Sequence, residues 1–199
     1  MKQQTEFCLP TAGKVVPDGP DWIHEVKYDG YRLRVVRSGK TVRLFSKGGT
    51  DWTKRYPWIV ETALKIKHDH FAIDGEAVIL GVDGISDFNA LHSRTEDNDV
   101  QLYAFDCLSF GGDDLTRVPL SMRKTNLMQL LRGRSQGIFV APYESGKIGP
   151  ELFEAACRMG LEGLVSKHKE RAYRIGRCDH WIKVKNRTHP AFTRVMNSF

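Results

Sequence analysis

The sequence predicts one α+β domain. The chain has 199 residues, of which 41% are hydrophobic and 27% charged, and this is enough for a single well-packed core. Runs of alternating β-branched and aromatic residues are mixed with segments of helical periodicity, but strands and helices do not alternate regularly. We find no internal repeat and no low-complexity segment. These observations favour an α+β fold over a repeated strand–helix–strand architecture.

The first third of the chain is expected to contain a β-hairpin and a helix. Residues 1–21 include three prolines and are expected to form a loop-like lead-in. Apolar and charged residues alternate over residues 22–36, a Ser-Gly-Lys turn follows, and residues 41–45 return. This pattern predicts a hairpin, with Lys27 just before its first strand. Pro57 at a first turn predicts a helix over residues 58–66.

Two acid-bearing strands and a helix are expected in the middle of the chain. Residues 71–80 and 101–110 are apolar runs that carry acids, and the polar residues 87–99 between them are expected to form a short helix and a loop. Ser121 is a candidate N-cap for a helix of about 11 residues that ends at Gly133.

The last quarter predicts one further helix and two strands. Gly149 and Pro150 open the helix and Gly160 closes it. Residues 161–168 and 180–186 are expected to be strands.

The charge distribution favours a polyanionic partner. The formal net charge is +6, and residues 163–199 contain nine Lys and Arg against two acids. Four cysteines lie far apart in sequence without a C-x-x-C pair, which argues against a zinc site or a disulfide framework and for reduced thiols in a cytosol. No apolar run approaches the roughly 20 residues that span a bilayer, and the N-terminus does not resemble a signal peptide. We therefore expect a cytoplasmic protein.

Charged residues inside apolar strands are the main departures from the pattern. A buried carboxylate is costly unless it is paired or holds a metal ion, and a lysine in such a run is equally unusual. An enzyme that handles a nucleoside triphosphate needs both types, because Mg²⁺ prefers oxygen ligands and phosphates attract cations. The acids are Asp74, Glu76, Asp106 and Glu162, and the lysines are Lys27, Lys167, Lys183 and Lys185.

Six short motifs resemble those of one enzyme family. They occur in the order KYDGYR, SKGG, DGEAV, YAFDCL, EGLVSK and WIKVK. The linking segments WIHEVKYDGYR, DFNALHSR, DLTRVPLSMRK and YRIGRCDHWIKVKN are also similar, so the resemblance covers residues 18–186. The chain thus resembles the adenylation domain of bacterial ligase D, the end-joining type of ATP-dependent DNA ligase. The resemblance implies a covalent nucleotidyltransferase, ATP-grasp-like fold of antiparallel sheets flanked by helices.

The resemblance also implies a reaction. Lys27 would attack the α-phosphate of ATP, AMP would pass from the lysine to a DNA 5′-phosphate, and a nick would be sealed. A free lysine is protonated at neutral pH, so its attack requires neighbouring cations and burial, for which Arg32, Lys183 and Lys185 are candidates. The implied cofactors are ATP and Mg²⁺, with Mn²⁺ as the alternative metal.

The other roles are carried over residue by residue. Lys183 and Lys185 would contact the α-phosphate, and their alternative is an outward-facing strand stripe. Glu76 would contact ribose or metal and Glu162 the metal, with structural ion pairing as the alternative for both. The remaining nucleotide contacts would be Glu25 at the adenine edge, Phe105 stacked on adenine or buried as core, Arg32 at ribose or phosphates, and Lys167 near the phosphates. Asp106 is expected to be a structural acid, and Arg177 to close the nucleotide pocket or meet DNA phosphate.

The chain departs from the family pattern in two ways. Lys47 stands where the family has arginine, which replaces a two-pronged phosphate contact with a point charge. The expected division is a lead-in at 1–21, the nucleotidyltransferase domain at 22–188 and a tail at 189–199, without the family's OB-fold domain, so we expect inefficient sealing. The expected partners are nicked or broken duplex DNA, with Ku or another end-joining protein as a candidate, and the expected state is a monomer.

Two alternatives to the ligase remain open. The chain could be a subunit that binds nucleotide or DNA ends with little turnover. It could also be an RNA ligase or a capping-type nucleotidyltransferase, because these share the lysine motif.

Overall fold

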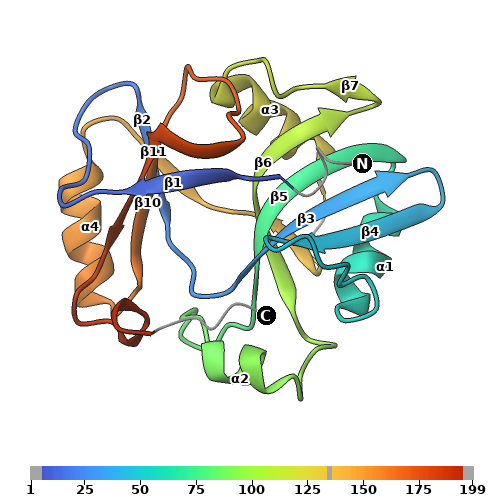
Figure 1. Ribbon diagram of the computed structural model, residues 1–199, viewed down its shortest axis with the longest axis horizontal. Helices are drawn as coiled ribbons and strands as arrows, with labels where there is room; N and C mark the ends of the chain where they lie inside the picture. Colours follow the sequence, from blue (N-terminus) through green and yellow to red (C-terminus); the bar gives the residue numbers. More distant parts are fainter. Residues whose placement is uncertain (1–5, 134–135, 195–199) are drawn as a thin grey trace.

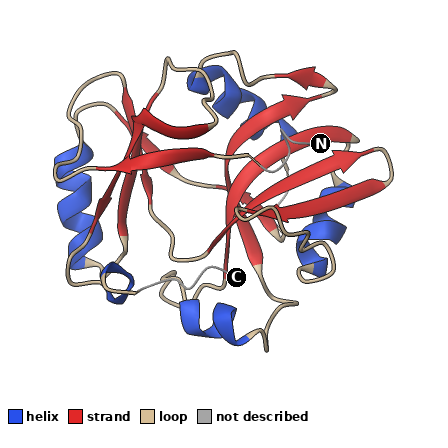
Figure 2. Cartoon of the chain, viewed as in Figure 1, coloured by secondary structure: helices blue, strands red, loops and turns tan. Residues whose placement is uncertain are grey.

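A computed structural model describes residues 6–133 and 136–194. Strands occupy the centre of the molecule and helices its periphery (Figures 1 and 2). In the described residues the strands form two sheets, both mostly antiparallel. The predicted α+β class is therefore confirmed.

The first sheet has the strand order β1-β11-β10-β2-β9. Only the β1–β11 pair is parallel among the pairings described in it. Helix α4 (Gly149–Arg158) packs against β10 and β2. The strands are β1 (Cys8–Ala12), β2 (Trp22–Val26), β9 (Tyr143–Ser145), β10 (Gly163–His168) and β11 (Gly176–Lys185).

The second sheet has the order β4-β3-β5-β6-β7, and β8 pairs with β6. Helices α1 (Pro57–Lys65) and α3 (Leu120–Leu130) pack on it, and α2 (Phe88–Ser93) follows β5. A 3₁₀ helix, Pro190–Phe192, follows β11. The strands are β3 (Tyr31–Ser38), β4 (Thr41–Ser46), β5 (His70–Val78), β6 (Gln101–Phe110), β7 (Asp113–Asp114) and β8 (Ile138–Val140).

Each sheet has its own apolar core. The larger core lies under the second sheet, where β3, β5 and β6 meet α1 and α3. A smaller core lies between α4 and the first sheet and includes Ala156, Leu164 and Val184. Among the described residues, none of the helices combines the length and hydrophobicity that crossing a bilayer requires.

The alternating run at residues 22–36 does not belong to one hairpin. The hairpin is β3–β4, as predicted, with Lys27 before it, but residues 22–26 form β2 in the other sheet. The chain crosses between the sheets at residues 27–30. Gly30 is required there, because a Cβ would lie 2.3 Å from the Ala77 carbonyl oxygen. Side chains point to opposite faces in turn along both β2 and β3, and apolar and charged residues alternate through the whole run. The sequence pattern therefore could not reveal the crossing.

Two further expectations need correction. The lead-in is not entirely loop, because Cys8–Ala12 forms the edge strand β1, where Pro10 is tolerated. Ser121 is not an N-cap: α3 begins at Leu120, and the backbone N–H groups of Leu120 and Ser121 donate to the carbonyls of Arg171 and Lys169. Long-range backbone contacts therefore satisfy the start of this helix.

A buried ion pair fixes α3 to the second sheet. Arg123 on α3 donates Nε and Nη2 to the two carboxylate oxygens of Asp106 on β6, at 2.7 and 3.0 Å. Both side chains are 0% exposed. Asp106 is thus a structural acid, as expected.

We predict that Asp106→Ala lowers the free energy of unfolding by about 3–5 kcal/mol, because it leaves the Arg123 charge buried and unpaired. Urea denaturation measures this loss. The matched control is Glu154→Ala, which removes an exposed pair with Arg158 at 3.9 Å and should cost less than about 0.5 kcal/mol. Equal losses for the two variants would contradict a structural role for the Asp106 pair.

Candidate active site

Lys27 lies in the segment that crosses between the two sheets. Its Nζ is 2.6 Å from Oε2 of Glu162, and its backbone N–H donates to the Gly163 carbonyl at 2.8 Å. The Lys27 side chain is 22% exposed, whereas that of Glu162 is 3% exposed. The Lys27 side chain is therefore partly accessible to solvent, while a buried carboxylate holds its amine in place.

Glu162 joins Lys27 to the end of β11. Its other oxygen, Oε1, is 3.0 Å from Nζ of Lys185, which also donates to the Ala191 carbonyl at 3.1 Å. Burial lowers the pKa of the Lys183 ammonium, and the charges of Lys27 and Lys185 lower it further. Lys183 therefore lies close to both of these lysines. Lys27, Lys183, Lys185 and Glu162 therefore form one group, in which cations outnumber the acid.

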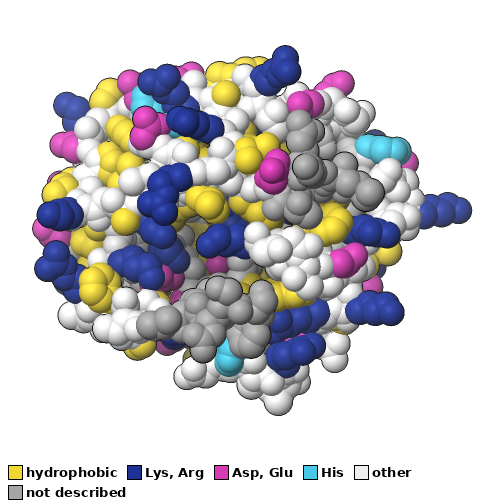
Figure 3. All heavy atoms as spheres, viewed as in Figure 1, with side chains coloured by type: hydrophobic (Ala, Val, Ile, Leu, Met, Phe, Trp, Pro, Cys, Tyr) yellow, Lys and Arg dark blue, Asp and Glu magenta, His cyan; other side chains and the backbone are white. Residues whose placement is uncertain are grey.

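This group suits a polyanionic ligand. Lys47 contributes to the lowered pKa of Lys183 and so also lies near it. Lys and Arg side chains gather over the middle of the face shown in Figure 3. A concentration of like charge on one face lowers the cost of bringing phosphate groups to it.

Glu25 occupies a second, more deeply buried charged group. Its carboxylate lies 2.6 Å from Nζ of Lys167 and also pairs with Lys124 of α3. Burial favours the neutral acid, but Lys124 and Lys167 outweigh it and lower the pKa of Glu25. Burial also lowers the pKa of Lys167 to about 8, against the opposing charge of Glu25. Glu25 is thus held as a buried carboxylate.

Phe105 has cations at its ring. The Nζ of Lys167 lies 4.0 Å from the Phe105 ring centroid and 4.2 Å from that of Trp181, and the Arg32 guanidinium carbon lies 4.8 Å from the Phe105 centroid. These distances are typical of cation–π contacts. The ring that the sequence suggests for adenine stacking is therefore engaged by protein cations in this structure.

Arg32 is anchored on both sheets. Its Nη2 donates to Oδ2 of Asp74 on β5 and its Nη1 to the Cys8 carbonyl on β1, both at 2.9 Å. Arg34 and Tyr173 also bind Asp74, at 2.7 Å each. Burial favours neutral Asp74, but Arg34 and then Arg32 lower its pKa to about 2. The contacts of Arg32 with Asp74 and Cys8 therefore connect the two sheets. The charge of Arg32 also acts on Glu76, as does that of Lys27, so Arg32 lies near the lysine site.

Glu76 has a different environment from the other acids. It is half-buried, and no hydrogen bond or salt bridge to its carboxylate is found in the described part of the chain. Burial raises its pKa to about 7, against the charges of Lys27 and Arg32, and Glu162 and Asp29 raise it further. It is therefore a carboxylate near Lys27 whose oxygens are available to a ligand or a metal ion.

Sequence reasoning missed several neighbours of the site. Tyr28, next to Lys27, packs on Tyr103 with ring centroids 4.7 Å apart, and Tyr103 is opposite Glu76 in the β5–β6 register. The available signal was that both tyrosines lie inside the motifs KYDGYR and YAFDCL. Lys124 was also missed, because a lysine on a helix gives no indication that its partner is on a distant strand.

The segment after β11 packs against the lysine motif. Nη1 of Arg194 donates to Oδ1 and Oδ2 of Asp29, at 2.9 and 2.7 Å, and the guanidinium carbon lies 3.9 Å from the Phe88 ring centroid. Residues 190–194 are thus not a free tail. The remainder of the expected tail, 195–199, lies outside the described residues.

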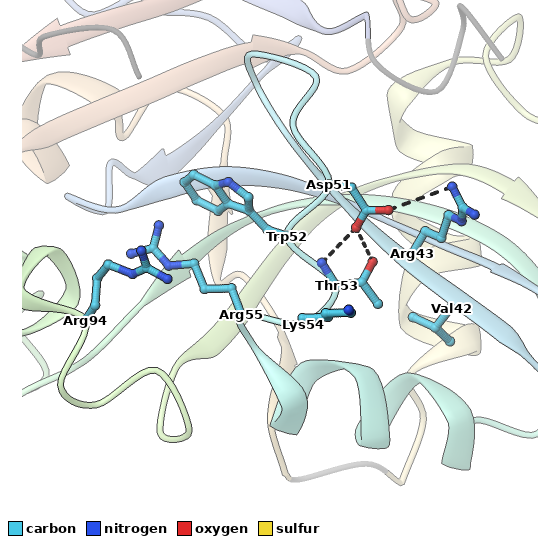
Figure 4. A pocket seen from close by; sticks show the side chains of 8 residues that line it. All are labelled: Val42, Arg43, Asp51, Trp52, Thr53, Lys54, Arg55 and Arg94. Atoms are coloured by element: carbon cyan, nitrogen blue, oxygen red, sulfur yellow. Dashed lines mark hydrogen bonds and ion pairs between the residues drawn. The ribbon is translucent and has the colours of Figure 1, made fainter.

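A separate hollow of about 590 Å³ lies beside β4 and α1 (Figure 4). In it the Asp51 carboxylate accepts from Thr53 and pairs with Arg43 at 3.8 Å. None of the residues predicted for the nucleotide site lines it. This hollow is therefore separate from the predicted nucleotide site.

The chain matches a family model described as ATP dependent DNA ligase domain, over residues 11–185. It is 32% identical over 195 residues to the multifunctional non-homologous end joining protein LigD of Pseudomonas aeruginosa, covering 96% of this chain and 23% of that protein. It is 33% identical over 166 residues to the multifunctional non-homologous end joining DNA repair protein LigD of Mycobacterium tuberculosis, covering 83% and 22%. The chain thus spans about a quarter of the length of the curated relatives.

Two solved structures are similar to this one. The ligase domain of M. tuberculosis LigD has a TM-score of 0.80 at 30% identity, covering 93% of this chain and 62% of that one. A mycobacterial DNA ligase D complexed with ATP and MES has a TM-score of 0.78 at 31% identity, covering 91% and 60%.

We predict that the stability penalty from Glu76 depends on pH. Its pKa is about 7 in the folded protein against 4.5 as the reference, so below pH 4.5 both states are protonated and there is no penalty. As pH rises through this window the unfolded state loses its proton first, and stability falls until about pH 7. The free energy of unfolding of Glu76→Gln, relative to that of the parent, should therefore rise by about 1 kcal/mol from pH 4 to pH 8, after discounting for solvent screening.

Urea denaturation in EDTA at several pH values measures this difference. Glu170→Gln, at an exposed carboxyl, is the matched control and should follow the parent. A Glu76→Gln difference that is the same at pH 4 and pH 8 would rule out the raised pKa.

Proposed function

Because the chain belongs to the family of ATP-dependent DNA ligase domains, we propose that it is the adenylation domain of such a ligase and that Lys27 is its nucleophile. Its fold is the α+β covalent nucleotidyltransferase fold that the sequence predicts. The observation that carries the proposal is the position of Lys27, whose side chain is partly exposed and whose amine is held by buried Glu162 beside Lys185.

In the first step the Nζ lone pair of Lys27 forms a bond to the α-phosphorus of ATP. The bond from this phosphorus to the oxygen that bridges the β-phosphate breaks, and pyrophosphate leaves. The attacking amine must be neutral, and Glu162, 2.6 Å away, is positioned to take its proton. Lys183 and Lys185 offset the negative charge that develops on the α-phosphate.

Glu25 is proposed to select adenine. A carboxylate kept ionised by Lys124 and Lys167 accepts a hydrogen bond from the exocyclic amine of adenine, whereas guanine presents a carbonyl oxygen at that position. Lys167, expected from the family resemblance near the phosphates, lies between Glu25 and the aromatic pair of Phe105 and Trp181, so we propose that it lies near the base instead. Arg32 is assigned to the ribose or the phosphates.

The base platform has two candidates. Phe105 carries cations at its ring, and stacking on it requires Lys167 or Arg32 to move. Tyr103 lies two residues earlier on β6, opposite Glu76. Comparing ATP binding by Phe105→Ala and Tyr103→Ala would separate them.

A magnesium ion fits the acids of the site in part. Mg²⁺ prefers oxygen ligands, and no described cation forms a salt bridge with the Glu76 carboxylate, so its oxygens could bind the ion. Manganese is the alternative metal. Glu162 fits only when Lys27 or Lys185 releases it, since each of its oxygens is paired. Such an ion, when bound, would neutralise charge on the phosphates.

The proposed acceptor is the 5′-phosphate of nicked or broken duplex DNA. The net charge of +6 and the lysines around Lys27 support a polyanionic partner, although Lys47 offers only a point contact where the family has arginine. Because the relatives are named as end-joining proteins, we also propose Ku or another end-joining protein as a partner, a monomeric state, and a location in the bacterial cytoplasm at the nucleoid. An end-binding subunit or an RNA ligase or capping-type enzyme would share the lysine site.

We predict that incubation with labelled ATP and magnesium gives one covalent AMP adduct on Lys27. Lys27→Ala should form no adduct, because the amine that attacks the α-phosphorus is removed. Intact-mass spectrometry with peptide mapping measures the adduct. The matched control is Lys40→Ala, at an exposed lysine in the hairpin turn, which should be adenylated like the parent. No adduct on folded parent protein would exclude the ligase reaction, and a preference for GTP would indicate a capping-type enzyme.

We predict that Lys183→Ala slows adduct formation by about 10²–10³-fold, because it removes a cation from the α-phosphate. Single-turnover kinetics with saturating ATP separate this rate from binding. Lys14→Ala, at an exposed lysine, controls for the loss of one positive charge. An unchanged rate with weaker ATP binding would place Lys183 at ground-state binding only.

A further inference from the structure

Two cysteines 170 positions apart in sequence lie next to each other in the fold. Sγ of Cys8 on β1 is 3.0 Å from Sγ of Cys178 on β11. Both residues are buried, at 0% and 2% exposure, and pack against Trp181, with Phe105 and Tyr173 around them. The wide spacing of the cysteines in sequence therefore concealed a spatial pair.

The two sulfurs have opposite proton affinities. The hydrogen bond with Cys8 lowers the pKa of Cys178 to about 7, against burial, and the backbone N–H groups of Trp181 and His180 assist. The same hydrogen bond, together with burial, raises the pKa of Cys8. At neutral pH the pair thus combines a thiolate with a neighbouring thiol, which is what oxidation to a disulfide requires.

We propose that Cys8 and Cys178 are a reactive thiol pair that a hydroperoxide oxidises to a disulfide joining β1 to β11. The Cys178 thiolate attacks one oxygen of hydrogen peroxide, the O–O bond breaks, and the sulfur becomes a sulfenic acid. The hydroxide that leaves takes up a proton from solvent and becomes the first water. The Cys8 sulfur then attacks the Cys178 sulfur, the S–S bond forms, the S–O bond breaks, and water leaves with the Cys8 proton. The two thiols together lose two electrons, and hydrogen peroxide gains them and is reduced to two waters.

The position of β1 gives the oxidant access. β1 is the edge strand of the first sheet and pairs only with β11 among the described strands. Opening of a short edge strand exposes the thiols without unfolding the core. The backbone of Cys8 also accepts from Arg32 at 2.9 Å and donates to the Tyr173 hydroxyl at 2.8 Å, so the cross-link fixes a strand that supports Arg32.

The experiment treats the full chain with hydrogen peroxide and measures intact mass, linked peptides and melting temperature. We expect a loss of 2 Da, because forming one disulfide removes two hydrogen atoms, together with a linked Cys8–Cys178 peptide and with Cys107 and Cys157 still present as thiols. A cross-link that closes such a long loop should raise Tm by several degrees, and dithiothreitol should reverse the rise.

Three variants test the assignment. Cys157→Ser, at a half-buried cysteine outside the pair, should form the link like the parent. Cys178→Ser should form no link and show no Tm rise. Cys8→Ser should stop at the sulfenic acid, which dimedone traps as one adduct on Cys178.

Two results would overturn the proposal. One is that both thiols remain alkylatable after peroxide treatment, or that the link forms only in urea. The other is a bound metal ion: the ligand atoms of Cys8, Cys178 and His180 lie within 4.8 Å of one another, and Nε2 of His180 is buried without a hydrogen-bond partner among the described residues. One equivalent of zinc that survives dialysis, and is lost in His180→Ala, would make the thiols metal ligands instead.

Discussion

The buried carboxylate of Asp74 is the contact on which the arrangement of the two sheets depends. It is 0% exposed and accepts from Arg32 and Arg34 of β3 and from Tyr173, which precedes β11. Tyr173 and Arg32 in turn bind the backbone of Cys8 on β1. A buried charge tolerates the loss of a partner poorly, so Asp74 and the two arginines that pair with it have little freedom to separate. Arg32, whose charge acts on Glu76 together with that of Lys27, therefore has a rigid support.

Lys27 itself is less constrained than this support. It lies in the crossing segment and keeps part of its side chain in solvent, while Glu162, which holds it, immediately precedes β10 and also binds the end of β11. Glu162 is thus far more deeply buried than the Lys27 side chain that it holds. This difference suits the role of nucleophile that we propose for Lys27.

The sequence was informative where structure is local or where a motif carries chemistry. The β3–β4 hairpin, α1 and α4 follow from turn residues and from proline or glycine at helix ends, and each requires only neighbouring residues. The structure also brings Lys27, Lys183, Lys185 and Glu162 together, as the family motifs imply, although their roles remain proposals.

The remaining features depend on contacts between distant residues. The division of residues 22–36 between two sheets leaves the alternation of the strands unchanged, so no local signal marks it. Lys124 reaches Glu25, and Cys8 reaches Cys178, only after the sheets have formed. Such pairings follow from topology, which period and propensity do not specify.

Three carboxylates share one arrangement. Asp74 lies between Arg32 and Arg34, Glu25 between Lys124 and Lys167, and Glu162 between Lys27 and Lys185. Each trio has one negative and two positive charges, so each carries an excess of one positive charge. Two cations around one buried acid stabilise its ionised form. The pKa values of Asp74 and Glu25 are accordingly lowered, although burial alone would raise them.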